Sequence, residues 1–110
     1  MHVPVGLSFA KAIVNNEFDN AYSMLSDDLK KVTTANQLKI EFNEMIEYGE
    51  TPVVVDGHYE EMTDWPAKQA GDIGWLYVSL SGDGFGEAVT LIIKSESGTP
   101  KIRDIEWGRP

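Results

Sequence analysis

The chain has 110 residues, of which 42% are hydrophobic and 25% carry a charge. These values predict one globular domain over residues 1–110 with a core of its own, and they exclude wholesale disorder. Because the sequence contains no cysteine, disulfides and thiolate metal sites are excluded as well. The 18 acidic and nine basic residues give a formal net charge of −9. This charge favours a basic partner protein over nucleic acid or anionic lipid, since both of the latter bind through Lys and Arg.

Nothing in the sequence predicts membrane insertion or export. No apolar run approaches the roughly 20 residues that cross a bilayer. The N-terminus also lacks the basic region and the long apolar segment of a signal peptide. We therefore expect a cytoplasmic protein that does not contact membranes, although a chain from which a leader had been removed would look the same.

The first third of the chain predicts two consecutive helices after a short, frayed lead-in at residues 1–6. Apolar residues recur on one face over residues 7–14. Asn15–Asn16 ends this helix, since Asn accepts the left-handed conformation at a helix C-terminus. The next helix begins at Phe18, and apolar residues follow three, four and seven positions later.

Two capping signals define the remaining helical segments. Ser26 caps one short turn over residues 27–32. Thr34 and Gln37 have the spacing of a capping box, which opens a longer helix. That helix is predicted to end at Tyr48–Gly49, because Gly is the usual residue just past a helix C-terminus.

The second half of the chain predicts an antiparallel sheet of four strands. In the second strand, apolar residues alternate with polar and aromatic ones, the period of two that marks a half-buried strand. Gly57 predicts a bulge or bend in the first strand. Residues 82–84 and 95–100 predict turns, and 64–74 form the longest loop. The predicted strands span residues 53–62, 75–81, 87–94 and 101–107.

The helical pattern of the first third resembles the opening of a known superfamily. In the run Ala12–Lys30, a helix ends at a small turn, an aromatic residue starts the next helix, and Ala-Tyr, Leu-Ser and Leu follow. This pattern is similar to that of the nuclear transport factor two-like superfamily. The resemblance implies an α+β fold in which N-terminal helices pack on a curved antiparallel sheet, in the order α-α-α-β-β-β-β, to form a cone.

A pocket between the sheet and the helices is expected in such a cone. Members of the superfamily include isomerases, dehydratases, binding modules and bacterial immunity proteins, so the resemblance selects no single function. We expect the pocket to be small and mainly apolar, with at most one buried carboxylate. Its predicted lining is Phe9, Ile13, Tyr22, Phe42, Leu76, Val78 and Leu91.

Four residues are candidates for catalysis: Asp104, His58, Asp56 and Tyr22. Enzymes of the superfamily place an acid or base inside the pocket, often on a late strand, which is where Asp104 lies in this sequence. If Ile102 faces the core, Asp104 does too; if Ile105 faces the core, Asp104 points outward. Both alternatives stay open. With two His and no Cys, neither a zinc site nor another cofactor is predicted.

Trp75 and Tyr77 lie on the opposite side of their strand from its apolar residues. Aromatic side chains exposed on a sheet often mark interfaces, so this pair predicts a homodimer formed through that face. The sequence favours a non-enzymatic domain that dimerises and binds a small apolar ligand or a protein partner, in an immunity-type or regulatory role. The alternative is a small isomerase- or dehydratase-like enzyme with an inward carboxylate.

Overall fold

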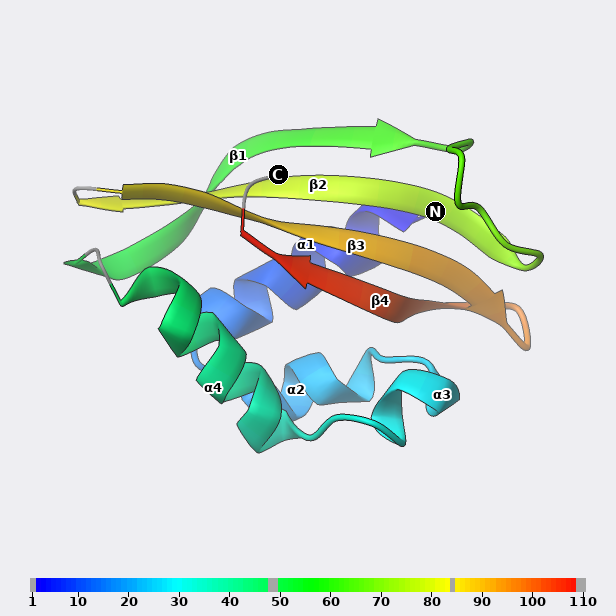
Figure 1. The fold of residues 1–110 in the computed structure, drawn as a ribbon, viewed down its shortest axis with the longest axis horizontal. Helices are drawn as coiled ribbons and strands as arrows, with labels where there is room; N and C mark the ends of the chain where they lie inside the picture. Colours follow the sequence, from blue (N-terminus) through cyan, green and yellow to red (C-terminus); the bar gives the residue numbers. More distant parts are fainter. Residues whose placement is uncertain (1, 48–49, 84, 109–110) are drawn as a thin grey trace.

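Four helices precede four strands in this α+β structure, a computed structural model that describes residues 2–47, 50–83 and 85–108. The strands form one antiparallel sheet in the order β1-β2-β3-β4, which does not close on itself, so β1 and β4 are its edges (Figure 1). The predicted order of helices before strands is confirmed. The helices are α1 (His2–Val14), α2 (Phe18–Ser23), α3 (Asp27–Lys30) and α4 (Ala35–Ile46). The strands are β1 (Glu50–Met62), β2 (Asp72–Asp83), β3 (Phe85–Glu96) and β4 (Thr99–Trp107).

The prediction of a frayed lead-in is wrong for residues 2–6, because α1 already begins at His2. Pro4 is compatible with this start, since the first turn of a helix leaves its N–H groups unpaired in any case. Gly6 lets α1 approach the sheet closely: a Cβ added there would lie 2.2 Å from Cδ2 of Leu76. Packing on the sheet thus stabilises a helical turn that Gly6 disfavours locally.

Both predicted capping residues accept the expected hydrogen bonds. The hydroxyl of Ser26 accepts one from the Leu29 amide at 3.3 Å. The hydroxyl of Thr34 accepts one from the Gln37 amide at 3.0 Å. At the end of α1, Asn16 has a φ of 62°, the left-handed conformation expected of it.

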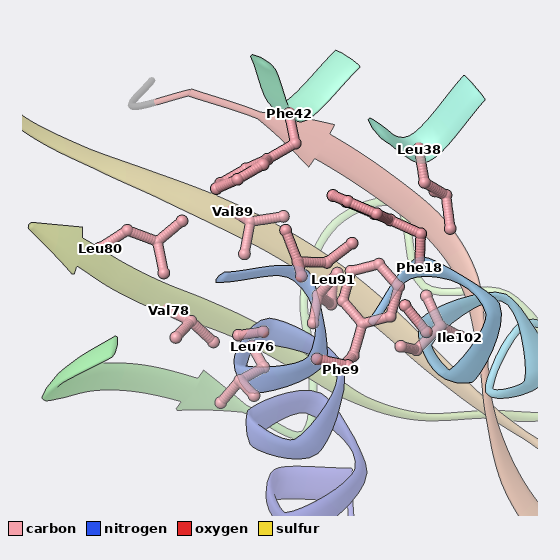
Figure 2. Packing of buried hydrophobic residues seen from close by; sticks show 14 of the residues in the cluster. Phe9, Phe18, Leu38, Phe42, Leu76, Val78, Leu80, Val89, Leu91 and Ile102 are labelled. Atoms are coloured by element: carbon pink, nitrogen blue, oxygen red, sulfur yellow. The ribbon is translucent and has the colours of Figure 1, made fainter. Parts of the chain in front are cut away.

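The helices cover one face of the sheet, which we call the helix face; the other is the open face. Figure 2 shows Phe9, Phe18 and Phe42 of the helices directed toward the leucine and valine side chains of β2 and β3. In β2, Leu76 and Val78 are 0% exposed, so the predicted alternation is confirmed. Burial of apolar surface, at about 25 cal/mol per Å², is the largest favourable contribution to such a fold.

The strands extend further than the sequence predicts. Because β2 begins at Asp72, the predicted loop over residues 64–74 ends earlier. Between β3 and β4, Ser97 and Gly98 have φ angles of 53° and 81°, as in a two-residue turn of the primed type. Two predicted boundaries lie outside the described residues: the helix end at Tyr48–Gly49 and the turn residue Gly84.

A β-bulge in β4 determines which face Asp104 occupies. The pairing of β3 with β4 skips Arg103, which is an extra residue on the β4 side. The strand therefore changes phase, so that Ile102 belongs to the core and Ile105, partly buried, packs against it. Asp104 pairs with Ile92 on the open face and is exposed. Both apolar anchors point inward, and the carboxylate lies at the β4 edge of the open face, where it borders hollows on both sides of that edge.

Gly74 in β2 lies where His2 covers the helix face. A Cβ added to Gly74 would lie 2.0 Å from Cγ of the His2 ring, whose Nε2 lies 3.2 Å from the Glu61 carboxylate. We expect Gly74→Ala to lower the free energy of unfolding by about 1–3 kcal/mol in urea denaturation, the usual range for overpacking. Adding His2→Ala should restore most of that loss, because it removes the clash. Gly86→Ala is the control, since a Cβ there meets nothing within 4 Å; equal losses at both glycines would contradict the expectation.

Candidate functional site

Two transverse rows of side chains cross the open face from β1 to β4. The strand register places Glu60, Tyr77, Thr90 and Glu106 in one row. The neighbouring row consists of Met62, Trp75, Ile92 and Asp104. The two middle strands contribute mostly aromatic or apolar side chains, whereas the edge strands contribute three carboxylates. The open face is therefore aromatic and apolar at its centre and acidic at its edges.

One hollow in this face, which we call the Trp65 hollow, lies where the β1–β2 loop meets the sheet. Its volume is about 320 Å³, near the lower end of the range for ligand pockets. The loop supplies one wall, and β2, β3 and β4 supply the rest. Its lining residues are Trp65, Ala67, Gln69, Trp75, Thr90, Ile92, Arg103, Asp104 and Glu106.

A buried ion pair that the sequence analysis missed holds Arg103 in the wall of this hollow. Nε and Nη2 of Arg103 donate to the two carboxylate oxygens of Asp72 at 2.6 and 2.7 Å. The two side chains are 19% and 1% exposed, respectively. These bonds hold the pKa of Asp72 below its usual value despite burial, and a bond from the Gln69 amide acts in the same direction. The same pairing raises the pKa of Arg103. The guanidinium stays charged, and the carboxylate of Asp72 balances that charge.

The two carboxylates of the Trp65 hollow form no hydrogen-bonded ion pair of this kind, although the charge of Asp104 also contributes to the raised pKa of Arg103. Neither Asp104 nor Glu106 forms an ion pair with a cation among the residues that the structure describes. Oδ1 of Asp104 accepts a hydrogen bond from the Ile105 amide at 3.0 Å. This bond satisfies an N–H on an edge strand, where unpaired groups otherwise invite another chain. Because Asp72 balances the charge of Arg103, the carboxylates of Asp104 and Glu106 give the hollow an excess of negative charge.

The aromatic side chains around the hollow are held in fixed arrangements. The rings of Trp75 and Tyr77 stack, with centroids 6.4 Å apart and planes inclined by 16°. Nζ of Lys68 lies 5.6 Å from the centroid of the Trp65 ring and donates to the Thr63 carbonyl oxygen at 2.6 Å. Trp65 thus already attracts one cation of its own chain through the negative face of the indole.

A second hollow, which we call the bulge hollow, lies over the irregular part of β1 and has a volume of about 310 Å³. Residues 56–58 stand opposite Ser79 alone, and Gly57 has a φ of 90°. The predicted bulge at Gly57 is therefore confirmed. The lining residues are Gly57, His58, Tyr59, Glu60, Tyr77 and Ser79. Tyr77 of the aromatic stack thus borders this hollow, and Trp75 borders the other.

Asp56 stabilises the bulge through hydrogen bonds. Its carboxylate accepts one from the Ser79 hydroxyl at 2.9 Å and one from the His58 amide at 3.0 Å. Nδ1 of His58 lies 3.2 Å from the same carboxylate. Burial raises the pKa of Asp56, but the hydrogen bonds outweigh it and leave the pKa below its usual value. Asp56 therefore keeps its negative charge, on the same strand as the exposed carboxylate of Glu60.

Two further hollows lie away from the open face. One of about 550 Å³ lies between the start of α1 and the β3–β4 turn, lined by Pro4, Val5, Ile73, Ser95, Gly98 and Pro100. The other, of about 290 Å³, lies between the α3–α4 region and the edge of β4. The seven predicted pocket residues line none of these four hollows. Six of them belong to the core cluster, and Tyr22 packs against it.

Comparison with protein-family models, with curated proteins and with solved structures finds no match to this chain. No helix in the described part is long and apolar enough to cross a membrane. Over residues 2–47, 50–83 and 85–108, no three His, Asp or Glu side chains gather in a way that could hold a metal ion. The open face, with its two hollows and its carboxylates, is the candidate site of this chain.

Of the four candidate catalytic residues, only Asp56 and His58 lie together, at the bulge in β1, and Asp104, His58 and Tyr22 lie in separate surroundings. Asp104 lines the Trp65 hollow and the hollow at the β4 edge. His58, whose side chain is 86% exposed, lines the bulge hollow. The hydroxyl of Tyr22 donates to the Lys30 carbonyl oxygen at 3.0 Å and so connects α2 to the end of α3. No two of the three residues share one of the four hollows.

We expect Asp104→Asn to leave the fold intact and to change the free energy of unfolding by less than about 0.5 kcal/mol, as at most surface positions. The side chain is exposed, and the amide oxygen of Asn can still accept the hydrogen bond from Ile105. Thermal and urea denaturation measure the effect. A loss above about 1 kcal/mol, the scale of a hydrogen bond made by a charged group, would show that the carboxylate of Asp104 itself stabilises the bulge in β4.

Proposed function

We propose that this chain is a non-enzymatic binding domain whose open face receives a basic segment of a partner protein. One observation carries the proposal: in the Trp65 hollow, two carboxylates that form no close ion pair with the described residues stand beside two indole rings. Indole faces attract ammonium and guanidinium groups, and carboxylates form charge-assisted hydrogen bonds with them. The net charge of −9 acts in the same direction, because it draws cationic partners to the surface.

The positions of the chain's own cations support this choice of partner. On the open face, Lys94 lies opposite Asp72 in the strand register, in the next row past the bulge in β4. Lys101 turns away and donates from Nζ to the Ser23 carbonyl oxygen at 3.2 Å. Glu60 and Glu106 lie in the row farther from these lysines, where a Lys or Arg of a partner would meet carboxylates.

A second copy of the chain is the other occupant that the Trp75 and Tyr77 stack suggests. A two-fold interface brings the same patch of both copies together. The acidic edges of the open face would then lie near their own equivalents, and such like-charge contacts are unfavourable. We therefore propose the basic partner in preference to the homodimer. Sedimentation at tens of micromolar tests this choice: a dimer that Trp75→Ser abolishes would replace our proposal.

We also propose membership of the nuclear transport factor two-like superfamily, supported by the Ala12–Lys30 pattern and the order of helices before a four-stranded meander. An acidic domain that captures a basic partner fits the immunity-type or regulatory role expected from the sequence. The isomerase- or dehydratase-like alternative has less support. General acid–base catalysis needs two polar groups within reach of one substrate, and Asp104, His58 and Tyr22 share no hollow. The carboxylate of Asp56 lies 3.2 Å from Nδ1 of His58 but is held by the Ser79 hydroxyl and the His58 amide.

A charge-matched pair of variants tests the proposed function. Hexalysine is titrated into the chain at low ionic strength and the binding is followed by calorimetry. We expect Glu106→Gln to weaken binding about two- to fivefold, the effect of losing one exposed ion pair. Glu44→Gln removes the same charge from an exposed position on α4 and should have a smaller effect. Equal effects of the two variants, or no binding to the unaltered chain, would contradict the proposal.

A further inference from the structure

We infer that the open face recognises an extended basic segment with the pattern Lys-x-Φ-x-Lys, where Φ is apolar and Arg can replace either Lys. This inference rests on the proposed function and adds to it the spacing of the recognised side chains. It follows from the row Glu60, Tyr77, Thr90 and Glu106, whose two ends are carboxylates on opposite edges of the sheet.

The distance between those carboxylates follows from the sheet itself. Glu60 lies on β1 and Glu106 on β4, the two edge strands, with β2 and β3 between them (Figure 1). Three spacings of about 4.8 Å separate their Cα atoms by about 14 Å. In an extended peptide, residues i and i+4 are about 13 Å apart, and residues i, i+2 and i+4 point to the same side. A segment crossing the strands therefore presents two Lys side chains at the separation of the two glutamates.

The centre of the same row suits the apolar residue of the pattern. Between the glutamates lie Tyr77 and Thr90, and Thr90 is only 6% exposed. Tyr77 also stacks on Trp75, so an apolar side chain at position i+2 would lie against a rigid aromatic surface. Burial of such a side chain is favourable because it removes apolar area from water.

The two hollows match the two ends of the segment. Glu60 belongs to the bulge hollow and Glu106 to the Trp65 hollow, and the Trp75 and Tyr77 stack separates them. Glu60 has no ion-pair partner among the described residues. The Lys at one end would lie near Glu60 and the charge that Asp56 retains, and the Lys at the other end would lie near Glu106 and Asp104.

Two peptides of identical composition test the spacing. Both carry blocked ends: Lys-Ser-Leu-Ser-Lys has the inferred pattern, and Lys-Lys-Leu-Ser-Ser has the same charge with the two lysines adjacent. Each is titrated into the isotope-labelled chain at low ionic strength, and affinities are obtained from NMR shifts. We expect the first peptide to bind about two- to fivefold more tightly, since the second loses one of two exposed ion pairs.

Two variants locate the ends of the peptide. Glu60→Gln should weaken binding of Lys-Ser-Leu-Ser-Lys to the level of the permuted peptide, while Glu44→Gln on α4 should leave the ratio of the two affinities unchanged. Equal affinities of the two peptides, with both weakened by Glu106→Gln, would overturn the spacing inference and leave the proposed function standing. If Glu106→Gln and Glu44→Gln weakened both peptides equally, the proposed function itself would fail.

Discussion

Replacing Arg103 with Met is expected to lower the free energy of unfolding by about 3–5 kcal/mol, the usual result when one partner of a buried ion pair is removed. The remaining carboxylate of Asp72 is 1% exposed and would keep only the hydrogen bond from the Gln69 amide. Asp72→Asn should cost less, about 1–3 kcal/mol. Its side-chain oxygen can still accept from Gln69, and Arg103 is 19% exposed, so water can reach the guanidinium.

Urea denaturation of the two single variants and of the double variant measures this coupling. We expect a coupling free energy of at least about 1 kcal/mol between the two positions, within the range for residues in direct contact. If Asp72→Asn were more harmful than Arg103→Met, or if the effects were additive, the ion pair of Asp72 and Arg103 would not make the expected contribution to stability.

The pH dependence of stability provides a second measurement of the same pair. The pKa of Asp72 is lower in the folded chain than its ordinary value of 3.8. Its contribution to stability is therefore complete above pH 3.8 and is lost as the pH falls through the lower folded value. The difference in unfolding free energy between the unaltered chain and Asp72→Asn should shrink as the pH falls below 3.8. A difference that grew on acidification would contradict the assigned direction of the pKa.

Leu91→Ala is expected to lower the free energy of unfolding by about 3–5 kcal/mol. Leu91 is 0% exposed in β3 and lies between Leu76 on one neighbouring strand and Ile105 on the other. Figure 2 shows it at the centre of the cluster that the helices cover. Because domains of this size are stable by about 5–15 kcal/mol, the variant should be folded only marginally, with an early transition in thermal denaturation.

Val32→Ala is the matched control for this deletion of core volume. Val32 is 78% exposed, so its replacement should change stability by less than about 0.5 kcal/mol. If both variants lost similar amounts of stability, the assignment of Leu91 to a tightly packed core would be wrong.

Local signals predicted much of the fold. The alternation in β2, the caps at Ser26 and Thr34, and the left-handed Asn16 each depend on a few adjacent residues, and the structure confirms them. The start of α1 was missed for the opposite reason. Gly6 disfavours a helix locally, and its close approach to Leu76 on the sheet outweighs that preference.

The candidate site was harder to predict, because it depends on strand register and on pairs distant in sequence. Ile102 and Ile105 gave conflicting indications of the inner face, since an extra residue at a bulge cannot be inferred from alternation. The ion pair of Asp72 and Arg103 joins positions 31 residues apart. The predicted role of Trp75 and Tyr77 as surface aromatics came from local alternation, but the acidic row around them appears only when four strands are aligned.

NMR mapping of the hexalysine complex tests most directly the claim that the open face binds a basic partner. The isotope-labelled chain is titrated with hexalysine, and shifts of backbone amides are followed along the sheet and the helices. We predict that the largest shifts cluster at Tyr77, Thr90 and Glu106, with small shifts at the exposed acids of α4. Shifts centred on α4, or spread evenly over the acidic residues of the surface, would contradict a binding site on the open face.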